Sequence, residues 1–286
     1  MKQVVIIILM LLSALNVKGQ TNRIDSLLLD LFNDDKTFNR LVSPAKLFLY
    51  SGFNYDDRAF YAGRELGDHM HVVTGNVYLF HTNGFYAGAS GLWYNQLHPS
   101  YTATVAVAGF RKPLNKKHTL TGRISYNRYF FNLPDSVISG VNLNSVGAGL
   151  TWRNSKAGAR VSFNAMFGND FGMNLTSALF ANLNLVHFGE TGRLCLAPEV
   201  SAFFGSETIG DESTGTAGDP LSATLSTTDK YGLLNTQAYI PLCLYAGDFS
   251  FEFGYSVNIP FTQDSNADYP ISSFFSFSIG LLLPLD

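Results

Sequence analysis

Long segments of this sequence alternate strictly between apolar and polar residues. In residues 249–259 one face collects Phe249, Phe251, Phe253, Tyr255, Val257 and Ile259. The other face collects Ser250, Glu252, Gly254, Ser256 and Asn258, and residues 159–167 and 175–185 repeat the pattern. Because successive side chains of a β-strand point to opposite faces, this pattern predicts strands with one apolar and one polar face.

The composition indicates what covers the apolar faces. Only 14% of the residues are charged, against about 25% in a typical soluble domain, whereas 14% are aromatic. Beyond the first residues no apolar run is long enough for a membrane helix, which needs roughly 20 residues. A closed barrel is the other structure that pairs all its backbone groups in lipid. The sequence therefore predicts an all-β, closed antiparallel transmembrane β-barrel.

Walking this template along the chain predicts about twelve strands, an even number as in bacterial single-chain barrels. They are expected near residues 46–54, 70–81, 85–95, 100–111, 118–131, 140–152, 158–167, 171–185, 193–205, 231–245, 248–259 and 271–284. Pro198 and Pro241 each remove a ladder hydrogen bond from a predicted strand, and we expect bulges there.

The predicted links alternate between short and long. The short links, expected on the periplasmic side, are residues 82–84, 112–117, 153–157, 186–192 and 246–247. The first contains Asn83-Gly84, a strong hairpin signal. The long links, expected outside, are residues 55–69, 96–99, 132–139, 168–170, 206–230 and 260–270, and residues 206–230 are typical of a mobile surface loop.

Three parts of the chain are predicted from its N-terminal end. Residues 1–19 are typical of a cleaved signal peptide, with Lys2, an apolar run over residues 4–15 and a cut after Gly19. Residues 20–45 form a periplasmic segment with a short amphipathic helix, and residues 46–286 form the barrel. The alternatives are an uncleaved anchor, and a helix that plugs the lumen rather than packing at its mouth. The apolar helix residues are Ile24, Leu27, Leu28, Leu31 and Phe32.

The charge of the chain excludes one class of partner. Cleavage after Gly19 removes Lys2 and Lys18 and takes the net charge from −3 to −5. A chain with this balance has no basic footprint for nucleic acid.

Taken together, these features resemble the small outer-membrane barrels common in Bacteroidota-type bacteria. The resemblance rests on the export signal, Gln20 after the cut, the aromatic-rich alternating strands and the final strand at residues 273–285. It covers residues 46–286 and includes no family-specific motif. It implies a place in the outer membrane, contact with outer-membrane lipid and lipopolysaccharide, and room for protein partners in an envelope complex.

A set of polar residues is predicted to line the lumen. A narrow barrel is often filled by its own side chains, so these residues form either a structural network or a constriction that selects small solutes. Their mixed charges argue against a strong ion preference. The predicted lumen residues are Arg123, Arg160, Glu199, Glu252, Asn164, Asn174, Asn182, Asn235, Gln237 and Tyr239.

Cys195 and Cys243 are the two cysteines. The strand phasing points both inward on neighbouring antiparallel strands, so their sulfurs are predicted to come close. An exported protein with two cysteines favours a disulfide. The alternative is two small side chains that fill the lumen.

Two other patterns were weighed as chemistry. His69 and His71, after Glu65 and Asp68, have a spacing that a divalent metal accepts, but loop histidines are more common, and no metal or cofactor is expected. His98-Pro99-Ser100 is similar to the His and Ser of outer-membrane phospholipases, yet no matching Asn follows on the next strand.

The sequence thus predicts a non-enzymatic outer-membrane barrel. It acts either as a narrow small-solute channel or as an accessory subunit of a larger envelope complex. The alternative is a phospholipase-like, lipid-modifying enzyme.

Overall fold

The computed structural model describes residues 47–61, 64–65, 69–132, 144–168, 171–189, 192–211, 226–262 and 269–285. The predicted signal peptide, the periplasmic segment and its helix therefore lie outside the described residues. Within the described ranges no helix is long and apolar enough to cross a bilayer.

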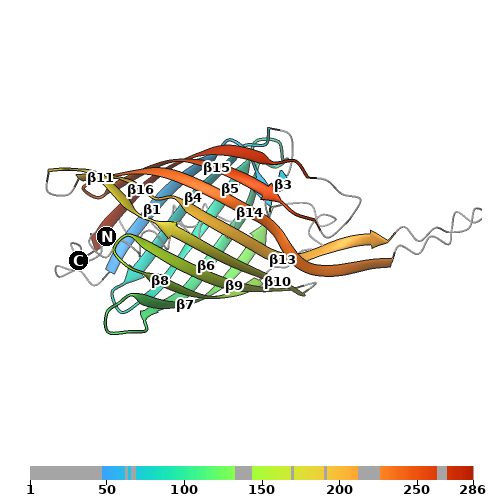
Figure 1. The fold of residues 1–286 in the computed structure, drawn as a ribbon, viewed down its shortest axis with the longest axis horizontal. Helices are drawn as coiled ribbons and strands as arrows, with labels where there is room; N and C mark the ends of the chain where they lie inside the picture. Colours follow the sequence, from blue (N-terminus) through green and yellow to red (C-terminus); the bar gives the residue numbers. More distant parts are fainter. Residues whose placement is uncertain are drawn as a thin grey trace, which may run out of the picture.

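Twelve long strands make up the wall of a barrel (Figure 1). They are β1 (Leu47–Asp56), β4 (Val72–His81), β5 (Phe85–Tyr94), β6 (Tyr101–Pro113), β7 (Leu120–Phe131), β8 (Asn144–Arg153), β9 (Ala157–Phe167), β10 (Phe171–Ala181), β13 (Glu199–Asp211), β14 (Ser226–Ala246), β15 (Phe249–Pro260) and β16 (Ser272–Leu285). Two further strands, β11 (Leu183–Phe188) and β12 (Gly192–Leu196), join the same sheet, whereas β2 (Phe60–Tyr61) and β3 (Arg64–Glu65) form a small separate ladder.

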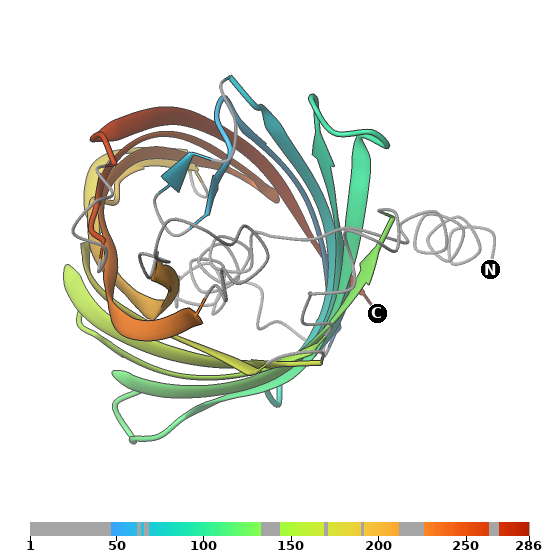
Figure 2. The same cartoon turned by 90° about the vertical axis from the view of Figure 1, so that its right-hand side faces the viewer.

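The sheet closes on itself. Strand β1 pairs with both β4 and β16, and β14 pairs with both β13 and β15, so the ladder continues around the ring without an edge. Every ladder is antiparallel, and Figure 2 shows the ring of strands from the end of the barrel. The predicted fold class, a closed antiparallel barrel of twelve strands, is confirmed.

The short links gather at one end of the barrel, which we call the short-turn end. The Asn83-Gly84 turn between β4 and β5 is one of them, and its Gly84 has a φ of 103°. A Cβ on Gly84 would lie 2.0 Å from the carbonyl oxygen of Arg111, so only glycine fits this turn.

Two predicted strands are interrupted at this end, where one continuous strand was expected each time. The predicted strand 171–185 divides at Asn182 into β10 and β11, and the predicted strand 193–205 divides at Ala197-Pro198 into β12 and β13. The predicted link 186–192 is instead largely the β11–β12 hairpin, which pairs with the end of β14.

The two prolines fit because their missing donors lie at these interruptions. The carbonyl of Pro241 accepts a hydrogen bond from Ala197 N at 3.1 Å. A strand residue directs its N–H and C=O to the same side, so the absent N–H of Pro241 faces the gap between β12 and β13. Strand β14 consequently runs unbroken through Pro241.

Residues 206–230 differ from the predicted mobile loop. Residues 206–211 of β13 pair with residues 226–231 of β14, so that the hairpin continues beyond the barrel wall (Figure 1). The backbone hydrogen bonds of this ladder outweigh the loop-like composition that the prediction used.

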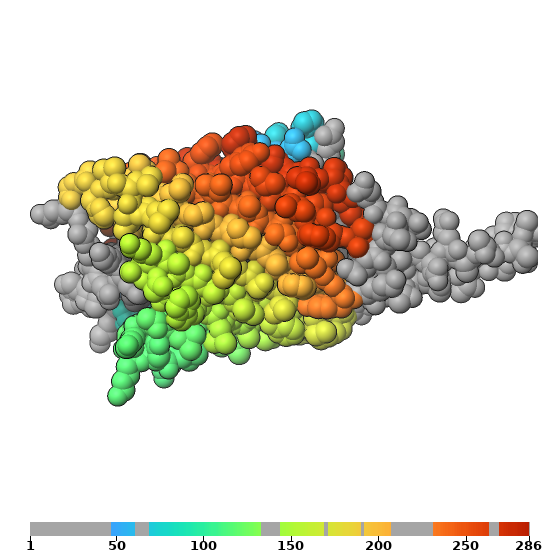
Figure 3. Space-filling view, in the orientation of Figure 1, coloured from blue at the N-terminus to red at the C-terminus, as the bar shows by residue number. Residues whose placement is uncertain are grey.

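The outer surface of the barrel is apolar. Outward side chains such as Leu179, Phe253 and Ile124 are 68%, 54% and 55% exposed. Such a surface would associate in water but suits the acyl chains of a bilayer. Figure 3 shows this outer wall, with the yellow β11–β12 hairpin and the green β6–β7 turn at its left-hand, short-turn end.

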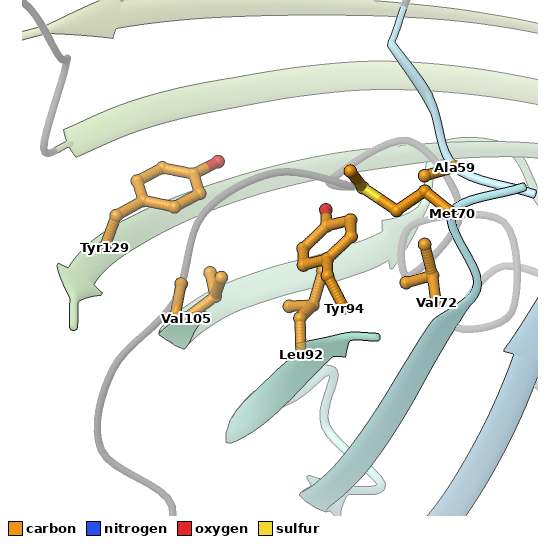
Figure 4. Packing of buried hydrophobic residues seen from close by; sticks show 8 residues of the cluster. Ala59, Met70, Val72, Leu92, Tyr94, Val105 and Tyr129 are labelled. Atoms are coloured by element: carbon orange, nitrogen blue, oxygen red, sulfur yellow. The ribbon is translucent and has the colours of Figure 1, made fainter. Parts of the chain in front are cut away.

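The inner faces of β1, β4, β5 and β6 form what we call the aromatic wall. At the short-turn end its cluster is Phe48, Tyr50, Tyr78, Phe80, Tyr86 and Val107, joined by Leu282 of β16. At the opposite end, a second cluster includes Ala59, Met70, Val72, Leu92, Tyr94, Val105 and Tyr129 (Figure 4). These side chains fill one side of the barrel interior.

Candidate functional site: the lumen

The inner faces of β7 to β10 and β13 to β15 form what we call the polar wall. The strand registers place inward residues opposite one another around the ring, for example Arg160 of β9 opposite Thr151 of β8 and Ala178 of β10. Nine of the ten predicted lumen residues share this inward register, and the tenth, Asn182, lies just beyond the end of β10.

Arg160 and Glu199 form an ion pair across the polar wall. One guanidinium nitrogen, Nη2 of Arg160, donates to both carboxylate oxygens of Glu199, at 2.8 and 2.7 Å. The pair bridges over β10, where Ala178 leaves room for it. The hydroxyl of Ser201 donates to the same carboxylate at 2.7 Å, and the Phe180 ring lies 5.9 Å from the guanidinium carbon. The geometry fixes both side chains against the wall.

Glu252 is held by two neighbours. The hydroxyl of Tyr239 donates to its Oε1, and the thiol of Cys243 lies 3.7 Å from its Oε2. The Tyr239 ring fits because Gly254 lies beneath it: a Cβ there would be 2.3 Å from Cε2 of the ring. This removes Glu252 from the set of side chains that extend into open space.

The amides on the polar wall bond to one another. The Asn235 amide donates to Oδ1 of Asn258 at 3.1 Å, and the Asn127 amide donates to Ser145 at 2.9 Å. Asn164 and Asn174 are direct register partners on β9 and β10. Buried amides bonded in this way add rigidity as well as polarity to the lumen.

The three remaining predicted residues lie apart from these pairs. Arg123 is 8% exposed and faces Arg111 across the β6–β7 ladder. Gln237 lies between Ser201 of β13 and Asn258 of β15. The backbone N–H of Asn182 donates to the carbonyl of Lys156 at 2.8 Å, which joins the end of β10 to the β8–β9 turn.

Three inward arginines were missed by the prediction: Arg111, Arg153 and Arg193. Arg111 and Arg153 lie at or beyond the predicted strand ends, and Arg193 is in the strand that Pro198 interrupts. Extending the alternation two residues further would have found Arg153, because it continues the inward series 147, 149 and 151 of β8. We had read Arg153 as the first residue of a turn.

Cys195 and Cys243 are direct partners in the β12–β14 register. Both are buried, and in this structure both are thiols rather than a disulfide. The bond between them remains a prediction.

The phospholipase-like motif lies in the link between β5 and β6. The hydroxyl of Ser100 donates to the carbonyl of Leu97 at 3.2 Å, so its proton points to the backbone rather than to the His98 ring. This arrangement lacks the hydrogen bond to a base that activates a serine nucleophile.

The histidine pattern beside β4 is also held by the backbone. Nδ1 of His71 lies 2.8 Å from the carbonyl of Asp57 and 3.2 Å from the Tyr55 hydroxyl. Among the residues that the structure describes, no group of three or more His, Cys, Asp or Glu side chains is placed to hold a metal ion. Asp68 lies outside the described residues.

Neither a family model nor a curated protein matches the sequence. Solved barrels are similar at low identity. The KdgM porin is 10% identical, with a TM-score of 0.46 over 84% of this chain and 99% of that one. The NanC porin is 12% identical, with a TM-score of 0.42 over 84% and 100%. LpxR from Salmonella typhimurium is 9% identical, with a TM-score of 0.44 over 82% and 99%. We draw no functional inference from similarity at this level.

Proposed function

We propose that this chain is a non-enzymatic outer-membrane β-barrel that acts as a narrow channel for small polar solutes. The observation that carries the proposal is the contrast between the two surfaces of one wall. On the outside Leu179 and Phe253 are exposed and apolar, whereas inside Arg160, Asn164 and Asn235 are polar and buried. A bilayer covers the first surface, and the second encloses a polar path.

The remaining parts of the proposal follow from this arrangement. The apolar surface contacts outer-membrane lipid and lipopolysaccharide acyl chains, the short-turn end faces the periplasm, and the signal peptide of residues 1–19 directs export. The Bacteroidota-type resemblance belongs to the proposal as well.

Planar-bilayer recording of the purified full chain tests the channel function. We expect discrete current steps. In β9, Ser162→Trp places an indole in the lumen and is expected to lower the single-channel conductance. Phe163→Trp, on the outward face of the same strand, is the matched control and is expected to leave the conductance unchanged.

Silence of the folded protein in the bilayer would contradict the channel function. It would favour the accessory role, which predicts that a protein partner stays bound during purification in mild detergent. Equal conductance in the two tryptophan variants would also contradict it, since the current would then not pass through the lumen.

A further inference from the structure

A cavity of about 660 Å³ opens at the short-turn end of the lumen, beside the polar wall. We call it the basic vestibule. Its cationic lining consists of arginines on strands β6, β8 and β12 and lysines on the two turns between strands. These residues are Arg111, Arg153, Arg193, Lys117 and Lys156. Among the described residues that line the cavity, none is an Asp or a Glu.

Hydrogen bonds hold the two lysine-bearing turns in shape. In the β8–β9 turn, Oδ1 of Asn154 accepts from the N–H groups of Lys156 and Ala157, both at 2.9 Å. In the β6–β7 turn, Oδ1 of Asn115 accepts from the Thr119 N–H at 2.9 Å. The side chains of Lys117 and Lys156 therefore project from turns with defined backbones.

The turns are also joined to one another. The N–H of Arg153 donates to the carbonyl of Thr119 at 2.8 Å, and the N–H of Asn182 donates to that of Lys156 at 2.8 Å. On the far side of the cavity, the Arg193 guanidinium lies 4.2 Å from the centre of the Tyr245 ring, a distance typical of a cation–π contact. The positive groups thus surround the cavity before any solute arrives.

The charge of the vestibule is reinforced from within the barrel. Arg111 and Arg123 are direct register partners across β6 and β7, which places two like charges side by side. The lumen carboxylates Glu199 and Glu252 belong to the pairs on β13 and β15 described above. Because the lumen is walled by lipid and protein, its field lines are concentrated along the pore.

Resting on the channel function above, we propose that the basic vestibule binds small solutes that carry two or more acidic groups, such as carboxylates or phosphates. Guanidinium and ammonium groups from different strands surround one volume, and carboxylates and phosphates are their preferred partners. The volume lies within the range of small-molecule sites, roughly 300–1,000 Å³. The vestibule makes the channel selective for such anions over neutral solutes and cations.

Calorimetry of the full chain in detergent tests the binding, with citrate and inorganic pyrophosphate as probes and sucrose as the neutral control. We expect citrate and pyrophosphate to bind and sucrose not to bind. The triple substitution Arg111→Gln, Arg153→Gln and Arg193→Gln is expected to weaken binding at least about tenfold, since it removes several charge-assisted hydrogen bonds. Equal binding by this variant would overturn the inference.

Two further variants keep the result interpretable. Lys117→Gln with Lys156→Gln changes exposed turn residues, which leaves the strands intact, and is expected to weaken binding by a smaller factor. Lys112→Gln with Lys116→Gln removes the same charge from exposed positions outside the cavity lining and is the matched control. If both pairs weaken binding equally, the effect is general surface charge and the inference is wrong.

Reversal potentials in a salt gradient separate this inference from the channel function. We expect anion selectivity that falls in the triple variant. A conducting but unselective wild-type channel would overturn the inference and leave the channel function standing. Citrate binding to a protein that never conducts would contradict the channel function and retain the site.

Discussion

The aromatic wall and the polar wall belong to one continuous sheet, yet they fill the lumen in different ways. On the aromatic wall, the rings of Phe80 and Tyr86 lie 6.2 Å apart and pack with their neighbours. A Cβ on Gly109 would lie 2.4 Å from the Tyr86 ring, so this glycine makes the space the ring occupies. On the polar wall, ion pairs and amides bond along the surface and leave the basic vestibule open.

This difference teaches how a membrane barrel divides stability from function. The outside faces lipid, so it gains little from packing against the rest of the protein. The aromatic wall supplies an interior apolar core instead, while the polar wall supplies the chemistry. Substitutions on the two walls should therefore have different consequences.

The largest expected effect is on the aromatic wall. Phe80 is 2% exposed, and Phe80→Ala is expected to lower the free energy of unfolding by about 3–5 kcal/mol, because it leaves a cavity among Tyr78 and Tyr86. Urea unfolding from detergent micelles, followed by tryptophan fluorescence, measures it. Leu79→Ala on the outward face is the control. A larger loss for Leu79→Ala would show that the aromatic wall is not the core.

A charge placed on either face of the polar wall should have a smaller effect that depends on the face. Val161 is 48% exposed on the outer surface of β9, and Val161→Arg is expected to cost about 2–4 kcal/mol in a bilayer. Ser162→Arg, one residue further along, points into the lumen and is expected to cost much less. Folding into lipid vesicles compares the two, and equal costs would contradict the assigned faces.

The Arg160–Glu199 ion pair is expected to contribute less again. Arg160→Ala leaves the Glu199 carboxylate without its cation, and we expect a loss of about 1–3 kcal/mol, at or below the range for buried pairs because the Glu199 side chain keeps 20% of its exposure. Replacing both residues by alanine should cost less than Arg160→Ala alone. A double variant at least as unstable as the single one would contradict a stabilising role for the pairing.

The smallest change concerns the two cysteines. They are direct register partners, so the predicted disulfide requires little backbone movement. Protein isolated from the envelope without reductant is expected to have no thiols that react with an alkylating reagent after unfolding. Two alkylated cysteines per chain would show that they are lumen-filling thiols instead.

Much of the fold was predictable because each strand carries its own signal. In β9 and β15 the alternation set the inward face, and with it the positions of Arg160 and Glu252. Local periodicity contains no information about where a strand breaks or how far a hairpin continues. The β11–β12 hairpin depends on Pro198, which we expected to form a bulge, and the long β13–β14 ladder overrides a loop-like composition.

The candidate site was less predictable for the same reason. Arg153 and Arg193 were missed because they lie where strands meet turns or interruptions, and the vestibule exists only once three such places come together at one end of the barrel. Lys117 and Lys156 follow no strand alternation, so only the folded turns place them beside the arginines.

The central claim is that one sheet separates acyl chains from an enclosed polar lumen, and a cysteine scan of β9 tests it most directly. Single cysteines at positions 159 to 166, in a Cys195→Ser and Cys243→Ser background, would carry nitroxide labels in lipid vesicles. We predict that odd positions collide mainly with lipid-dissolved oxygen and even positions mainly with a water-soluble nickel chelate. Uniform access of the nickel chelate to all eight positions would contradict the account.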